Sequence, residues 1–147
     1  MESRTLPGEP LWNDAVNKQI LRLELPLPPS VNHYYFTTLQ GKRIMTGDAK
    51  AWMEEAKLII RLAARKYGWN IIDTGKVIMR LWVYWPDNRR RDQHNLHKAL
   101  ADAPEGIIFA DDRQLLIHDM DFAVDKGKPR VVIEFEPRVE VEIRGMG

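Results

Sequence analysis

The densest group of side chains able to bind phosphate or a metal cation lies between residues 89 and 98. It opens with three consecutive arginines, Arg89, Arg90 and Arg91. Their positive charges repel one another unless an anion lies between them, and nucleic-acid phosphates are the most common such anions. A solvated basic turn would have the same composition, so the run alone does not establish an anion site. Asp92 follows directly and can supply a carboxylate ligand or cap a helix.

The residues after Asp92 are predicted to form a helix from about Gln93 to Ala103, ended by Pro104. At 100° per residue, its apolar stripe should face the core and contains Leu96, Ala99, Leu100 and Ala103. A second stripe combines an imidazole, an ammonium and a carboxylate with an amide beside them, in the residues His94, Lys98, Asp102 and Asn95. These residue types, next to three arginines, favour a metal and phosphate site.

A second acidic element, Asp111-Asp112, follows the apolar run at residues 107–109. Two adjacent carboxylates are costly to bring near other acids unless a divalent cation offsets their repulsion. Oxygen ligands and the absence of cysteine favour Mg²⁺ or Mn²⁺ over zinc. A turn or a helix cap is the simpler interpretation of the same pair. His94 and His97 have a spacing compatible with zinc, but no further soft ligand is near them in the sequence.

The flanking patterns predict how these residues are positioned. Strands are expected at residues 21–25, 77–85, 115–124 and 130–136, a short hairpin within 31–43, and a long helix that begins near Thr46 and ends near Gly68. This order predicts a single small α/β (α+β) domain with a mixed β-sheet and two main helices. Asp119 and Asp121 should lie on the same, solvated face of their strand. We divide the chain into an N-terminal arm (1–18), a folded domain (19–137) and a C-terminal tail (138–147).

Composition restricts the possible functions. The chain has 147 residues, of which 44% are hydrophobic and 29% charged, with no cysteine and a net charge of +1. These values exclude a disulfide scaffold and a thiol nucleophile, and they require any nucleic-acid site to be a local patch. No apolar run approaches the 18 residues of a membrane span, so we expect no membrane partner and a cytoplasmic, nucleoid-associated location.

Four motifs in order carry a resemblance to a known family. They are P-P-S-x-N-x-x-Y (Pro28 to Tyr35), R-R-R-D-x-x-N-L-x-K (Arg89 to Lys98), Asp102, and D-D-x-Q (Asp111 to Gln114). The chain resembles the RusA-type Holliday junction resolvases, or crossover junction endodeoxyribonucleases, from about Leu21 to Phe135. The resemblance implies a homodimer of small α/β subunits that resolves four-way DNA junctions by paired symmetric nicks, with Mg²⁺ or Mn²⁺ as cofactor, in DNA recombination and repair.

The resemblance also implies roles for individual residues. It makes Asp92 and Asp112 acidic metal ligands, with Asp111 beside them, and Lys98 a catalytic lysine. Arg89, Arg90, Arg91 and Asn95 are expected to contact DNA, together with the loop residues Asn32, Lys42 and Arg43. Alternatives are a nuclease for other branched DNA such as flaps or forks, a catalytically weakened junction-binding protein, and a ribonuclease.

One position departs from the family pattern. The helix of the best-known members begins D-x-D, whereas this chain has Asp92-Gln93-His94. An imidazole binds Mn²⁺ acceptably and Mg²⁺ less well, because Mg²⁺ prefers oxygen. His94 is thus a candidate metal ligand and catalytic residue, or alternatively a general base that does not touch the metal.

If His94 is a ligand, Mn²⁺ should support faster DNA cleavage than Mg²⁺. Initial rates measured at saturating concentrations of each ion test this expectation. Equal or faster cleavage in Mg²⁺ would contradict it.

Overall fold

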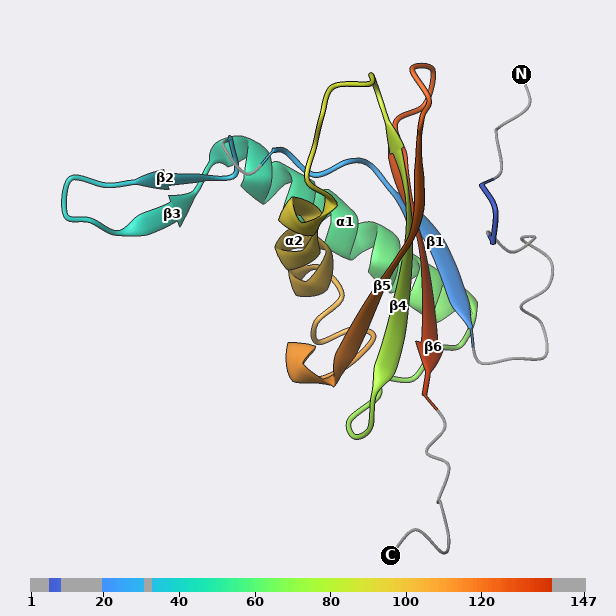
Figure 1. The fold of residues 1–147 in the computed structure, drawn as a ribbon. Helices are drawn as coiled ribbons and strands as arrows, with labels where there is room; N and C mark the ends of the chain where they lie inside the picture. The colour runs from blue at the N-terminus through green and yellow to red at the C-terminus, as the bar shows by residue number, and fades with distance from the viewer. Residues whose placement is uncertain (1–5, 9–19, 31–32, 139–147) are drawn as a thin grey trace, which may run out of the picture.

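In the computed structural model, residues 6–8, 20–30 and 33–138 are described, and they form one mixed sheet, one hairpin and two α-helices (Figure 1). The strands are β1 (Leu21–Leu25), β2 (Tyr35–Thr37), β3 (Arg43–Met45), β4 (Val77–Trp85), β5 (Leu115–Val124) and β6 (Arg130–Pro137). The helices are α1 (Gly47–Lys66) and α2 (His97–Asp102), with the short 3₁₀ turns η2 (Gln93–Leu96) and η3 (Asp112–Gln114). The predicted α+β class is confirmed. The predicted arm and tail lie mostly outside the described residues.

The sheet has the order β1-β6-β4-β5, and β4 and β5 run parallel while the other neighbours are antiparallel. Figure 1 shows α1 and α2 on one side of this sheet, with the β2–β3 hairpin projecting from the end of α1. Alternate residues of the strands point toward the helices and form the core with the buried face of α1. That face recurs every three or four residues and contains Ala49, Trp52, Ala56, Ile60 and Ala64.

The opposite face of the sheet combines aromatic residues with buried ion pairs. Glu134 accepts from Arg22 Nε at 3.0 Å and from Arg80 at 2.6 Å. The described part of the arm also contacts this face, since Trp82 Nε1 donates to the carbonyl oxygen of Pro7 at 3.4 Å. No helix in the described part of the chain is both long and apolar enough to cross a bilayer.

The predicted helix at 93–103 forms as two pieces. Asp92 caps η2, where its carboxylate accepts from the backbone N–H of His94 at 2.9 Å, and α2 then continues to Asp102. The predicted apolar stripe is confirmed, because Leu96, Ala99, Leu100 and Ala103 are all buried. The packing of this stripe directs the other side of η2 and α2 away from the core.

The predicted placement of Asp119 and Asp121 on one solvated face is wrong. The ladder between β4 and β5 pairs Leu81 with Asp119 and the next residue, Trp82, with Asp121, so Met120 is an extra residue in a β-bulge. The bulge reverses the alternation of side chains along β5. Asp119, before the bulge, shares the helix side of the sheet with Leu115 and Ile117, and its carboxylate contacts His97 Nε2 at 2.9 Å there; Asp121, after the bulge, lies on the other side.

Candidate nuclease site

All the candidate residues outside the hairpin lie in the crossover between β4 and β5, residues 86–114. Parallel strands need such a connection, because the chain must return along the sheet before it can pair in the same direction. In Figure 1 the crossover descends from the upper end of β4 through α2 to the orange turn η3 at the lower end of β5. This return path determines which side chains share a site.

The polar side of η2 and α2 forms a pocket with the hairpin. The pocket has a volume of about 180 Å³, and its lining includes His94, Asn95 and Lys98 from the crossover and Tyr34, Tyr35 and Arg43 from the hairpin segment. The Arg43 guanidinium lies over the Tyr35 ring, 4.2 Å from its centre. The structure therefore brings together four of the predicted functional residues, namely His94, Asn95, Lys98 and Arg43.

Two residues of this pocket, Lys98 and Tyr34, lie close to other ionisable side chains. Lys98 Nζ lies 3.5 Å from an Asp102 oxygen, and its side chain remains 69% exposed. The Tyr34 hydroxyl is buried without a hydrogen-bond partner, and burial, assisted by Tyr35 and Asp102, raises the pKa of Tyr34 to about 12. The pocket thus presents a neutral phenol and an accessible ammonium. Two other residues were predicted to contact DNA from this part of the chain. Lys42 is exposed at the turn, and Asn32 lies outside the described residues.

The arginine run lines a second pocket of about 290 Å³, which also contains Trp85 and Phe122. Asp87 binds Arg91 at 2.7 Å and Arg89 at 3.3 Å, and these hydrogen bonds, chiefly from Arg91, hold the pKa of Asp87 well below its usual range. Arg90 is exposed, and none of the described contacts pairs it with an acid. Asp87 was not predicted as part of this group, although its i, i+4 spacing to Arg91 was a usable signal.

The second acidic element forms a cluster of three carboxylates at η3. One oxygen from each of Glu105, Asp111 and Asp112 lies within 4.8 Å of the others. Arg113 binds Asp111 at 3.0 Å and is the main reason that the pKa of Asp111 falls to about 2. The backbone N–H of Asp112 donates to Glu105 at 3.0 Å. Glu105 was not predicted, because only the folded turn at residues 103–111 brings it next to Asp112.

Local hydrogen bonds also explain part of the D-D-x-Q motif. Asp111 caps η3, and the Gln114 side chain accepts from the backbone N–H of Asp111 at 2.9 Å. The Gln114 amide donates to the carbonyl oxygens of Ile72 and Gly75, both at 3.0 Å. The motif therefore holds the acidic cluster in place at the start of β5.

The acids predicted to share a metal are distributed over the crossover. Among the described residues, Asp92, His94 and Asp112 do not form a group with ligand atoms within 4.8 Å of one another; His94 groups with His97 and Asp119 instead. Asp92 begins η2, before α2, whereas Asp112 follows α2 and directly precedes β5. Within one subunit, the carboxylates of Asp92 and Asp112 therefore do not belong to one such group.

The described residues thus combine a mixed sheet, a cation-rich crossover and a cluster of three carboxylates. Comparison of the sequence with known protein families identifies the class of protein. The family model described as endodeoxyribonuclease RusA matches residues 26–144. The crossover junction endodeoxyribonuclease RusA of Escherichia coli (strain K12) is 31% identical over 126 residues, covering 85% of this chain and 94% of that protein. The namesake protein of Enterobacteria phage 82 is 30% identical over 129 residues, with the same coverage.

The chain therefore belongs to the RusA endodeoxyribonuclease family. This result confirms the resemblance inferred from the motifs and the expected class of enzyme, an endodeoxyribonuclease.

The contacts of Asp87 generate a test of the arginine run. Replacing Asp87 by Asn keeps a side-chain acceptor for the turn but removes the charge that neutralises Arg89 and Arg91. We expect Asp87→Asn to bind duplex DNA about threefold more tightly or better in low salt, with a steeper dependence of the affinity on salt, because more phosphate contacts release more counterions. Fluorescence anisotropy titrations at several salt concentrations measure both quantities.

Asp73→Asn is the matched control, since Asp73 is an exposed acid outside the crossover. Weaker binding by Asp87→Asn, or an equal gain in both variants, would show that the arginines do not contact DNA.

Proposed function

We propose that this protein resolves four-way DNA junctions by divalent-metal-dependent hydrolysis, as a homodimer that makes paired symmetric nicks. The observation that carries this proposal is the match to relatives named crossover junction endodeoxyribonucleases over 85% of the chain. The phosphate-binding and acidic side chains gathered in one crossover support the chemistry. Two-fold symmetry would present two equivalent sites to the opposite strands of a symmetric junction.

The donor set fits a hard cation. Glu105, Asp111 and Asp112 offer only oxygen atoms, as Mg²⁺ and Mn²⁺ prefer, and three neighbouring carboxylates are repulsive without a counter-charge. Arg113 supplies part of that charge to Asp111, which leaves Asp112 and Glu105 as the least compensated members. When bound there, a divalent cation supplies Lewis acidity and stabilises charge that develops on a phosphoryl oxygen.

The cationic side chains have separate roles in this proposal. Lys98 is exposed in the pocket and can stabilise the leaving 3′ oxygen of the phosphodiester. Arg90 and its neighbours position flanking phosphates without reading the sequence, while Asn95, Lys42 and Arg43 extend this contact toward the hairpin. Asn32 has the same proposed role, on the basis of its place in the family motif alone.

The separation of Asp92 from Asp112 has a consequence for assembly. Asp92 precedes α2 and Asp112 follows it in the chain, and the two residues do not fall in one group of ligand atoms within a subunit. We infer that Asp92, with His94, completes the metal centre of the partner subunit in the homodimer. This arrangement keeps both acids as ligands of one centre and makes cleavage depend on dimer formation.

Cleavage of four-way, Y-shaped and linear duplexes of matched sequence tests the function. We expect wild-type protein with Mn²⁺ or Mg²⁺ to make paired nicks in the four-way substrate and to leave the linear duplex intact. Asp112→Asn should lower the cleavage rate at least about 100-fold because a metal ligand is lost, while junction binding, followed by gel shift, stays near that of the wild type.

Glu54→Gln, which removes an exposed acid of α1, is the control and should cleave normally. Faster cutting of the Y-shaped substrate would favour a flap or fork nuclease. Binding without any cutting by the wild type would favour a junction-binding protein, and normal cutting by Asp112→Asn would contradict the proposed centre.

A further inference from the structure

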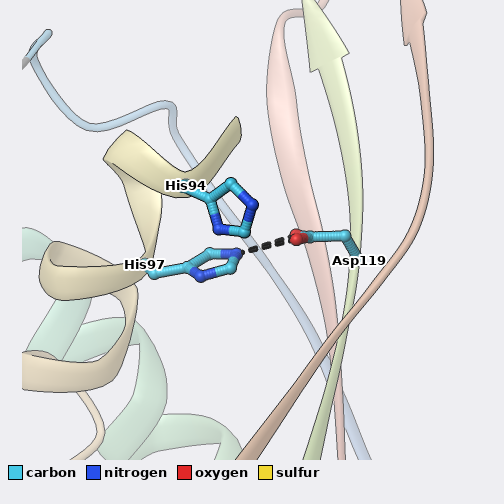
Figure 2. A group of neighbouring side chains, drawn as sticks. All are labelled: His94, His97 and Asp119. Atoms are coloured by element: carbon cyan, nitrogen blue, oxygen red, sulfur yellow. Dashed lines mark hydrogen bonds and ion pairs between the residues drawn. The ribbon is translucent and has the colours of Figure 1, made fainter. Parts of the chain in front are cut away.

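A second group of metal-ligand side chains lies apart from the carboxylate cluster. His94 and His97 extend from η2 and the start of α2 toward Asp119 of β5, as Figure 2 shows. One ligand atom from each residue lies within 4.8 Å of the other two. His97 Nε2 is 2.9 Å from both carboxylate oxygens of Asp119, and the two imidazole rings are 5.0 Å apart between centres. None of the three residues belongs to the carboxylate cluster.

Asp119 belongs to this group because of its place in the strand alternation of β5. Leu115, Ile117 and Asp119 pair in turn with Val77, Met79 and Leu81, and they share the helix side of the sheet. The extra residue Met120 follows Asp119 and moves only the later residues, including Asp121, to the opposite phase. No further soft ligand lies near His94 and His97 in the sequence, but the folded chain brings the carboxylate of Asp119 to them as a third ligand.

We propose that His94, His97 and Asp119 form a binding site for a borderline transition-metal ion such as Zn²⁺. Two imidazoles and one carboxylate with open positions are a ligand set that zinc accepts and that Mg²⁺, which prefers oxygen, does not favour. Tetrahedral zinc bonds to nitrogen and oxygen of about 2.0 Å place ligand atoms roughly 3.3 Å apart. The existing 2.9 Å contact between His97 and Asp119 is slightly shorter than this spacing, and His94 lies within 4.8 Å of both, so small side-chain shifts suffice to admit the ion.

The surroundings favour access of an ion from solvent. His94 and Asp119 are exposed, and the His97 side chain is 21% exposed. In the absence of a metal, a hydrogen bond joins His97 to Asp119, and a bound cation would replace the proton in that bond. The ion would then link the crossover directly to β5, and its open coordination positions would face the solvent.

This site shares His94 with the proposed nuclease centre, so its test is kept separate from junction cleavage. The experiment therefore uses substitutions at His97 and Asp119, and its readout is metal binding. Isothermal titration of the full chain with Zn²⁺, with Mg²⁺ in excess, measures the affinity directly. X-ray absorption at the zinc edge then reports whether imidazoles coordinate the ion.

We expect wild-type protein to bind Zn²⁺ despite the Mg²⁺, with imidazole scattering in the absorption spectrum. His97→Ala and Asp119→Asn should each weaken binding at least about tenfold while circular dichroism shows an unchanged fold. His118→Ala and Asp121→Asn are matched controls from the opposite side of the same strand, and both should bind like the wild type.

Asp112→Asn should also retain Zn²⁺ binding, which separates this site from the carboxylate cluster. Equal zinc affinity in the wild type and in both site variants would overturn the proposal. Loss of binding in Asp112→Asn alone would overturn it as well, because it would assign the zinc to the carboxylates. Failure to cleave junctions, in contrast, would affect only the proposed function.

Discussion

The parallel pairing of β4 with β5 is the constraint on which the rest of the structure depends. It requires a return path of residues 86–114, and among the described residues this path carries most of the candidate phosphate-binding and metal-binding side chains. The apolar stripe of η2 and α2 packs this connection against the sheet, since Leu96 and Leu100 are buried in the core. Because that stripe is fixed, the opposite side of the helix must present His94, Asn95 and Lys98 to the pocket beside the hairpin.

Charge is balanced locally along this path. Asp87 neutralises two of the three arginines, Arg113 neutralises Asp111, and Asp102 lies next to Lys98. These pairs are mostly exposed, so each contributes little to stability, and their main effect is to decide which charges stay available. Arg90 and the pair Glu105–Asp112 are the charges left without an opposite partner among these contacts. They are also the charges best suited to a phosphate and a cation.

Local sequence patterns predicted the helices and strands, whereas contacts between residues distant in the sequence determine which candidate site residues lie together. The apolar periods of β4 and α1, the cap at Asp92 and the stripe from Leu96 to Ala103 were all readable, because they depend on neighbours in sequence. Two features were not. Glu105 joins Asp112 only through the fold of a turn, and Asp119 joins His97 only because the crossover places His97 over the face of β5 to which Asp119 points. The inserted residue Met120 also places Asp121 on the opposite face from Asp119, and nothing in the residues 119–121 themselves signals it.

The proposed centre requires that Asp92 of one subunit and Asp112 of the partner subunit act together in the dimer, since α2 separates the two residues along the chain. Mixing the variants Asp92→Asn and Asp112→Asn tests this requirement directly. Each variant alone should fail to cut a four-way junction, while heterodimers contain one centre with both acids intact. The mixture should therefore nick the junction at roughly one quarter of the wild-type number of sites, given random pairing in a two-fold dimer. A mixture as inactive as the separate variants, with heterodimers shown to be present, would contradict a shared centre.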